Sequence, residues 1–254
     1  MTEQFKGSPW NCDSIDQWNQ PGYWSDYYRD LLADRQDPIR RKLVVWRDCD
    51  RLIYTLSRIG KLPVRDGKDE IRFLDAGCGI SALPYVLKAW GFHVVALDTC
   101  EQAIQISAKQ NPSDEELAQC IRNWEPSRDY RGSYTLIDDP KKSLESLQNL
   151  KGVGGSVSFI HADWLDRSAC TGPFDFIYCR NSLRRSKKPY WRDSIRRFYE
   201  MLAPRGLLIL ETVNALDLMN EVHDLLREIG FVSLEKHLTR DEDHKYVDAY
   251  WPTG

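Results

Sequence analysis

The stretch RFLDAGCGIS, residues 72–81, passes from an apolar run through a carboxylate into two glycines one residue apart. Because glycine has no β-carbon, Gly77 and Gly79 can adopt positive φ values and let a ligand approach the backbone closely. A helix that begins near Ser81 would add free N–H groups and the positive end of its dipole. The stretch therefore predicts a ligand-binding turn between a strand and a helix.

The residues on both sides of this turn predict a βαβ unit. The segment IRFLDAG, residues 71–77, is short and apolar enough for a buried strand, and the apolar spacing over residues 83–90 is that of a helix. HVVALD, residues 93–98, predicts a second strand. Because strand, helix and strand follow within about 30 residues, we expect parallel strands with the turn at the carboxyl end of the first.

The alternation of strands and helices continues to the end of the chain. Further strands are predicted at SVSFIHADW (156–164), FDFIYCRNS (174–182) and GLLILETV (206–213), with helices after the second and the third. GFVSLEKHL (230–238) and KYVDAYW (245–251) can pair as an antiparallel hairpin. The pattern predicts an α/β fold, with a Rossmann-like, seven-stranded doubly wound sheet that ends in this hairpin.

Two further segments differ in character from this repeating unit. Residues 1–62 predict an N-terminal helical arm or lid, since apolar residues recur at steps of three and four from Ile39 to Leu56. We expect residues 63–254 to form the cofactor-binding domain. Within that domain, residues 111–155 are polar and predict an insertion.

Composition excludes several classes of function. A net charge of −3 gives no general attraction to nucleic acid. The seven cysteines are odd in number and never spaced as C-x-x-C, which argues against a disulfide framework and a zinc site, so we expect no metal. No stretch approaches the ~20 apolar residues of a membrane helix, and the first ten residues lack the apolar core of a secretion signal. We therefore predict a cytoplasmic protein with no membrane partner; its oligomeric state is left open.

Two classes of cofactor fit the glycine turn, and Asp75 separates them. Gly77, Gly79 and Ala82, with Asp98 further on, satisfy the dinucleotide fingerprint. A carboxylate at Asp75, however, would lie near the approach path of a pyrophosphate, whereas it suits a ligand that bears an ammonium group. S-adenosylmethionine is such a ligand, because it carries an ammonium, a carboxylate, a ribose and a sulfonium but no phosphate.

At this turn the sequence resembles the class I S-adenosylmethionine-dependent methyltransferases. Their acid-x-Gly-x-Gly motif is matched over residues 75–79, and Ser81 stands where a third glycine is frequent. The resemblance implies that Asp98 binds the ribose hydroxyls and that Asp163 accepts a hydrogen bond from the adenine amine. It also implies that Trp164 packs on the adenine ring.

The resemblance extends over the fourth and fifth predicted strands. GPFDFIYCRNSL, residues 172–183, resembles the family's fourth-strand motif, which brings residues 179–181 to the sulfonium side. MLAPRGLLIL, residues 201–210, resembles the following helix-turn-strand, with Arg205 in place of a usual glycine. The resemblance implies S-adenosyl-L-methionine as the cofactor, bound by Asp75, Gly77, Cys78, Gly79, Asp98, Thr99, Asp163, Trp164, Cys179 and Arg180.

The acceptor of the methyl group is less constrained. The run from His161 to Arg185 resembles small-molecule methyltransferases of the thiopurine and thiol type, which implies a small-molecule acceptor with an S-, O- or N-nucleophile. An ionised thiol needs no base whereas a hydroxyl usually does, and no histidine is convincingly placed as one, so catalytic residues are left unassigned. An N-terminal aromatic group could face the sulfonium or simply pack: Trp18, Tyr23, Trp24, Tyr27 and Tyr28.

Three other functions remain open from the sequence. A methyltransferase acting on protein or RNA would use the basic cluster of residues 184–197. A non-catalytic cofactor-binding subunit would share the turn but transfer no methyl group. An NAD-dependent oxidoreductase is disfavoured by Asp75.

Overall fold

The computed structural model describes residues 22–33, 70–81, 83–89, 91–110, 112, 154–185, 188–213, 216–240 and 245–252. The amphipathic helix predicted from Ile39 to Leu56 lies outside these residues, as does nearly all of the predicted insertion. Within the described part of the chain, no helix combines the length and the apolar character of a membrane span.

The described strands form one seven-stranded sheet in the order β3-β2-β1-β4-β5-β7-β6. Strands β1 to β5 pair in parallel, and β7 pairs antiparallel with both β5 and β6. The predicted α/β class with a parallel sheet is therefore confirmed. The strand bounds are β1 (Arg72–Ala76), β2 (His93–Asp98), β3 (Ser156–His161), β4 (Phe174–Arg180), β5 (Leu202–Val213), β6 (Phe231–Arg240) and β7 (Lys245–Pro252).

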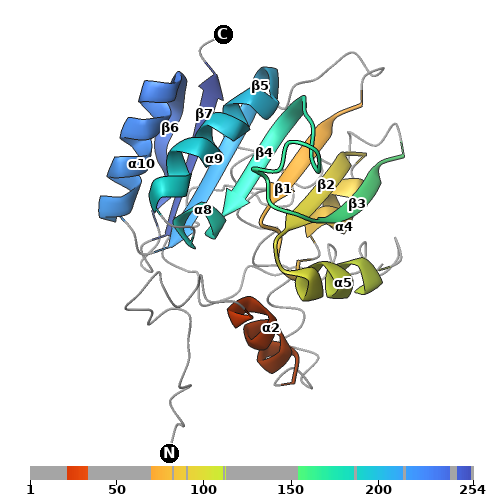
Figure 1. Ribbon diagram of the computed structural model, residues 1–254. Coiled ribbons are helices and arrows are strands. Elements are labelled where there is room, and N and C mark those ends of the chain that lie inside the picture. Colours follow the sequence, from red (N-terminus) through yellow and green to blue (C-terminus); the bar gives the residue numbers. More distant parts are fainter. Residues whose placement is uncertain are drawn as a thin grey trace, which may run out of the picture.

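Helices lie on both faces of the sheet and below one of its ends (Figure 1). In this view α9 and α10 lie in front of the sheet, α4 lies behind β2 and β3, and α2 lies below the carboxyl ends of the strands. The helix bounds are α2 (Tyr23–Ala33), α4 (Leu83–Ala89), α5 (Glu101–Gln110), α8 (Ser182–Arg185), α9 (Lys188–Met201) and α10 (Leu216–Ile229). Tyr23 and Trp24, two members of the N-terminal aromatic group, begin α2.

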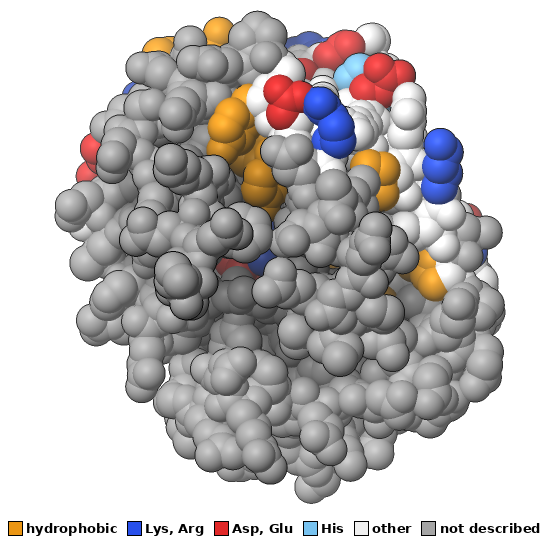
Figure 2. Space-filling model, turned by 90° about the horizontal axis from the view of Figure 1, so that it is seen from below, with side chains coloured by type: hydrophobic (Ala, Val, Ile, Leu, Met, Phe, Trp, Pro, Cys, Tyr) orange, Lys and Arg blue, Asp and Glu red, His pale blue; other side chains and the backbone are white. Residues whose placement is uncertain are grey.

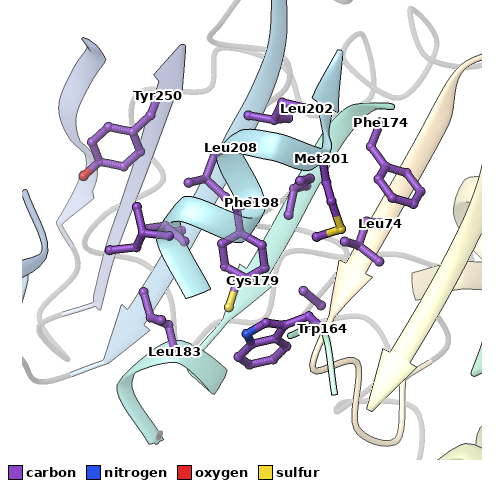
Figure 3. Packing of buried hydrophobic residues seen from close by; sticks show 14 of the residues in the cluster. Leu74, Trp164, Phe174, Cys179, Leu183, Phe198, Met201, Leu202, Leu208 and Tyr250 are labelled. Carbon is purple, nitrogen blue, oxygen red and sulfur yellow. The ribbon is translucent and has the colours of Figure 1, made fainter. Parts of the chain in front are cut away.

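The core follows the alternation of side chains along the buried strands. On one face, Leu74 of β1 and Cys179 of β4 belong to an apolar cluster that Phe198 and Met201 of α9 complete (Figure 3). On the other face, Phe73 stacks on Phe176, with ring centroids 5.9 Å apart, and Phe92 meets both rings edge-on. Apolar side chains are thus buried on both faces of the sheet, as expected of a parallel sheet covered by helices.

The strand order reverses between β1 and β4, which predicts a crevice at their carboxyl ends. The chain runs outward from β1 to β2 and β3, and then returns to place β4 on the other side of β1. At such a switch point, the connections after the two central strands leave in opposite directions and open a crevice between them. The glycine turn follows β1, so it borders this crevice.

Near its start, β5 holds a non-glycine residue in the left-handed region. Arg205 has a φ of 68° and an exposed side chain. The next residue is the buried Gly206, where a β-carbon would come within 2.8 Å of the Phe174 carbonyl oxygen. The glycine that Arg205 replaces in the family's usual motif would adopt this φ without a steric cost.

Replacing Arg205 by glycine should raise the free energy of unfolding by about 0.5–1 kcal/mol. An L-residue in the left-handed region costs roughly 1–2 kcal/mol, and the greater freedom of glycine in the unfolded chain offsets part of the gain. Urea denaturation of the wild type, R205G and R205A checks this. R205A removes the same exposed side chain but keeps the β-carbon, so an equal gain in both variants would contradict the backbone explanation.

Candidate active site

The turn after β1 needs glycine for both conformation and space. Gly77 has a φ of 76° and Gly79 a φ of 55°. A β-carbon at Gly77 would clash with the side chain of Ser182, which begins α8 two residues after β4. A β-carbon at Gly79 would lie 2.5 Å from the hydroxyl oxygen of Tyr28 in α2. The two glycines thus bring β1, β4 and α2 together at one point.

The amide groups of this turn are already hydrogen-bonded within the protein. The N–H groups of Gly77 and Cys78 donate to the carbonyl oxygen of Leu97, with N···O distances of 2.7 and 3.0 Å. The N–H of Gly79 donates to Asp98 Oδ2 at 2.8 Å. The turn therefore does not offer these donors to a phosphate group.

The helix after the turn is also capped by side chains. The sequence predicts free N–H groups from Ser81 onward, but α4 begins at Leu83. The N–H of Ser81 donates to Ser107 Oγ at 3.4 Å, and the N–H of Leu83 donates to Ser81 Oγ at 3.1 Å. The expectation of free donors at Ser81 is therefore wrong, because serine hydroxyls accept hydrogen bonds from these N–H groups. Fewer donors are then available to bind an anion here.

Asp98, at the end of β2, holds the glycine turn through its carboxylate. Besides accepting from Gly79, its carboxylate accepts a hydrogen bond from the N–H of Cys100 through Oδ1 at 2.8 Å. The same side chain therefore holds the glycine turn and the start of α5.

Asp75 is the most unusual charge in the site. Its side chain is only 3% exposed, and within the described residues no hydrogen-bond donor reaches its Oδ2. Burial, and next the nearby negative charge of Asp98, raises the pKa of this carboxyl to about 7. A buried carboxylate oxygen without a donor is costly unless a cation joins it. The residues present thus fit the ammonium group of S-adenosylmethionine.

The end of β4 is tied to both neighbouring strands. Asn181 has a φ of 55°, and its N–H donates to the Glu211 carbonyl oxygen of β5 at 2.7 Å. The hydroxyl of Ser182 donates to the Gly77 carbonyl oxygen at 3.1 Å. Asn181 is 7% exposed, and no donor among the described residues reaches its Oδ1. A second buried oxygen without a donor among the described residues therefore lies directly after β4.

A charged network lies on the opposite face of β4 from the cysteine. The Arg180 Nε lies 3.3 Å from Glu211 Oε1, and the hydroxyl of Tyr178 donates to Glu211 Oε2. Glu211 is fully buried, whereas the side chain of Arg180 is 22% exposed. The sequence predicts Arg180 in the site but gives no signal for Glu211 and Tyr178, since only the register between β4 and β5 brings them together.

The two predicted cysteines take different positions. Cys179 is 1% exposed, and its sulfur lies among Phe198, Leu183 and Trp164 (Figure 3). Burial raises the pKa of its thiol to about 12. Cys78 lies within the glycine turn, where burial and the charges of Asp75 and Asp98 raise its pKa well above the ordinary value. Both thiols therefore stay protonated. Because the side chain of Cys179 lies in the core, only its backbone is available to a ligand at the end of β4.

The segment after β3 carries the two residues predicted to hold the adenine. Asp163 is exposed, and its Oδ1 accepts a hydrogen bond from the N–H of Leu165 at 2.9 Å. Trp164 is 8% exposed and packs against Phe198, while its Nε1 donates to Ser194 Oγ at 2.9 Å. Trp164 is thus part of the core. Its Cζ3 atom lies 3.5 Å from where a Gly77 β-carbon would be.

The segment between β2 and α5 carries Thr99, the last of the predicted cofactor residues. Its side chain is exposed, and its carbonyl oxygen lies 3.1 Å from the Nε2 of His161 at the end of β3. The predicted residues thus lie at the carboxyl ends of β1, β2, β3 and β4, on one edge of the sheet. On the described part of this face, acidic and basic side chains lie beside one another and hydrophobic side chains reach the surface (Figure 2).

A family model described as a methyltransferase domain matches residues 40–249. The chain belongs to the class I S-adenosylmethionine-dependent methyltransferases. The predicted family and its cofactor, S-adenosyl-L-methionine, are thereby confirmed. Within the described residues, no group of three or more His, Cys, Asp or Glu side chains could hold a metal ion.

Known proteins are similar to this chain at low sequence identity. The mitochondrial ubiquinone biosynthesis O-methyltransferase of Dictyostelium discoideum is 24% identical over 168 residues, which cover 58% of this chain. The match spans about half (49%) of that relative's length. Magnesium protoporphyrin IX methyltransferase from Synechocystis, with bound S-adenosylmethionine, is 16% identical, with a TM-score of 0.54 and 93% of each chain covered.

A third match is a TehB-like S-adenosylmethionine-dependent methyltransferase from Corynebacterium glutamicum. It is 12% identical with a TM-score of 0.51, and the match covers 92% of this chain and all of that one. At such identities the likeness to solved structures shows the fold. The Rossmann-like methyltransferase fold predicted from the glycine turn is confirmed on this basis.

Asp75 should make the fold less stable as the pH rises through neutrality. Its pKa is about 7 in the folded protein, against an ordinary value of 3.8. Between these values the folded protein holds a proton that the unfolded chain releases, so the free energy of unfolding falls as pH rises from about 4 to about 7. Across this interval the wild type should lose up to roughly 4 kcal/mol relative to D75N.

Urea denaturation of the wild type and D75N at several pH values measures this loss. Asp224→Asn is the matched control, because it removes an exposed carboxylate from α10. This control should follow the wild type. If the stabilities of the wild type and D75N differed by the same amount at every pH, a raised pKa of Asp75 would be contradicted.

Proposed function

We propose that this protein transfers the methyl group of S-adenosylmethionine to a small-molecule acceptor with an S-, O- or N-nucleophile. The observation that carries the proposal is the buried Asp75 carboxyl beneath a glycine turn whose own amides are occupied. Such a site favours a cationic ligand and disfavours a diphosphate, which argues against an NAD-dependent oxidoreductase.

Each predicted residue has a separate part in holding the cofactor. Asp75 would accept the ammonium group, Asp98 the ribose hydroxyls, and Asp163 the adenine amine. Gly77 and Gly79 would admit the cofactor close to the backbone. The other proposed contacts are Cys78 through its backbone, Thr99, Trp164, Cys179 through its backbone, and Arg180.

The bound cofactor supplies an activated methyl group on its sulfonium sulfur. The protein's task is then to align the nucleophile with that carbon and to exclude water. The hydrogen bond from Ser182 to Gly77 joins the segment after β4 to the glycine turn. The carboxyl ends of β1 and β4 would therefore hold the cofactor as one rigid unit. Neither described thiol of the site serves as a nucleophile, because the pKa values of Cys78 and Cys179 are raised.

We propose that residues 1–62 act as a lid over the cofactor and that residues 111–155 shape the acceptor pocket. The described part of this arm, α2, supports the first idea. The hydroxyl of Tyr28 lies close to Gly79, and Ser25 Oγ lies 3.7 Å from Cys100 Sγ at the start of α5. Aromatic rings of α2 pack on one another, with the Trp24 and Tyr28 centroids 6.1 Å apart. They would bring apolar surface to the cofactor site.

A small-molecule acceptor is supported by the relatives. The Dictyostelium relative is, by its name, an O-methyltransferase of ubiquinone biosynthesis, and the Synechocystis protein methylates magnesium protoporphyrin IX. On the described part of the face that Figure 2 shows, acidic and basic side chains lie beside one another. The likeness to thiol and thiopurine methyltransferases and the cytoplasmic location stay predictions.

Titration calorimetry with S-adenosylhomocysteine and with NAD tests the proposal. We expect heat of binding with the former and none with the latter. Asp98→Ala should weaken binding at least about tenfold, because it removes both the ribose acceptor and the bond that holds Gly79. Asp224→Ala removes the same charge from the distant α10 and should bind as the wild type does. Heat with NAD alone would contradict the proposed function.

A further inference from the structure

Helix α9 holds the segment that follows β3, residues 162–173, through buried side chains. The indole N–H of Trp164 donates to Ser194 Oγ at 2.9 Å. Arg197 donates from Nε to the Trp164 carbonyl oxygen at 3.2 Å and from Nη2 to the Cys170 carbonyl oxygen at 2.6 Å. All four residues are at most 9% exposed. Two side chains of α9 thus bind both ends of the loop from Trp164 to Cys170.

Asp163 directly precedes the first residue that α9 holds, and it lies close to the end of β2. The N–H of Ala162 donates to the Asp98 carbonyl oxygen at 3.1 Å, which joins this segment to the residue proposed to bind the ribose. The exposed Asp163 carboxylate accepts a hydrogen bond from the N–H of Leu165. The direction of this carboxylate therefore depends on the backbone at Trp164.

Packing alone does not account for a charged side chain at Arg197. This residue belongs to the basic cluster of residues 184–197, yet it is buried and its guanidinium donates to backbone carbonyls of its own chain. Glu200, also in α9, lies 3.5 Å from its Nη1. Burying a charged pair is costly, and well-packed apolar side chains are often as stable or more so. An apolar side chain, however, cannot hold two carbonyl groups in fixed positions.

We propose that Arg197 and Ser194 set the adenine selectivity of the cofactor site, because they hold the segment that carries Asp163. Both are positioning residues, which touch Trp164 and act on the cofactor only through Asp163. The inference rests on the proposed function, in which Asp163 accepts a hydrogen bond from the adenine amine. A carboxylate held in one direction favours a base with a donor at that position over a base without one.

Two ligands test this inference: S-adenosylhomocysteine and its purine analogue, in which hydrogen replaces the amine of the base. Titration calorimetry should show that the wild type binds the former at least about tenfold more tightly, because the analogue lacks a hydrogen bond to a charged group. Asp163→Ala should abolish this preference. Arg197→Met keeps a long side chain but donates no hydrogen bond, so the preference should fall at least about threefold.

The ratio of the two dissociation constants separates lost positioning from lost stability. A merely structural role of Arg197 would weaken both ligands equally and leave this ratio unchanged. Arg197→Met added to Asp163→Ala should not change the ratio further, because both residues act on the same contact. Arg192→Met is the matched control, since this arginine of α9 pairs with Glu228 of α10. The control should keep the wild-type ratio.

Ser194→Ala gives a second test, which decides alone if Arg197→Met does not fold. It removes the acceptor of the Trp164 indole N–H, so it should lower the preference by a smaller factor than Arg197→Met does. An unchanged ratio in either folded variant would overturn the inference. Failure of the wild type to bind S-adenosylhomocysteine would overturn the proposed function as well. Equal binding of both ligands by the wild type would remove only the adenine role of Asp163 and this inference.

Discussion

Burial of the Asp75 carboxyl beneath the glycine turn is the constraint on which the site depends. Removing a carboxylate from water without a partner is costly, and the protein meets part of that cost by keeping the group protonated up to a pH of about 7. The same residue at the surface would stabilise nothing and bind nothing. A buried, ionised Asp75 is favourable only when a cationic ligand is bound. Pairing this carboxylate with the cofactor's ammonium group therefore contributes to the free energy of binding.

The hydrogen bonds of the glycine turn hold its backbone around Asp75 and occupy the amide groups that could otherwise bind an anion. Asp98 and Leu97 occupy the amides of the turn, and Ser107 both bonds to the Ser81 amide and donates to the Gly79 carbonyl oxygen at 3.0 Å. The usual anion-binding features of a glycine turn are thereby used internally. Two buried oxygens, Asp75 Oδ2 and Asn181 Oδ1, have no donor among the described residues, and such acceptors suit a ligand that carries donors and lacks phosphate.

The sequence predicts the parts of the fold that depend on local pattern. The βαβ unit around Gly77 and the parallel sheet follow from apolar runs and glycine spacing, and the structure agrees. Contacts set by strand register could not be predicted: Glu211 meets Arg180 only because β5 pairs with β4 in one register. The side chain of Cys179 faces the core because alternation along β4 turns it away from Arg180. Trp164 likewise belongs to the core, since α9 supplies Ser194 as the partner of its indole N–H.

The most direct measurement of the central claim is the number of protons released when S-adenosylhomocysteine binds. Calorimetry in buffers of different ionisation enthalpy gives this number. If the ammonium group pairs with Asp75, binding lowers a pKa of about 7, so the wild type should release close to one proton at pH 6 and almost none at pH 8. D75N should release none at either pH. Binding by the wild type without proton release at pH 6 would contradict the account.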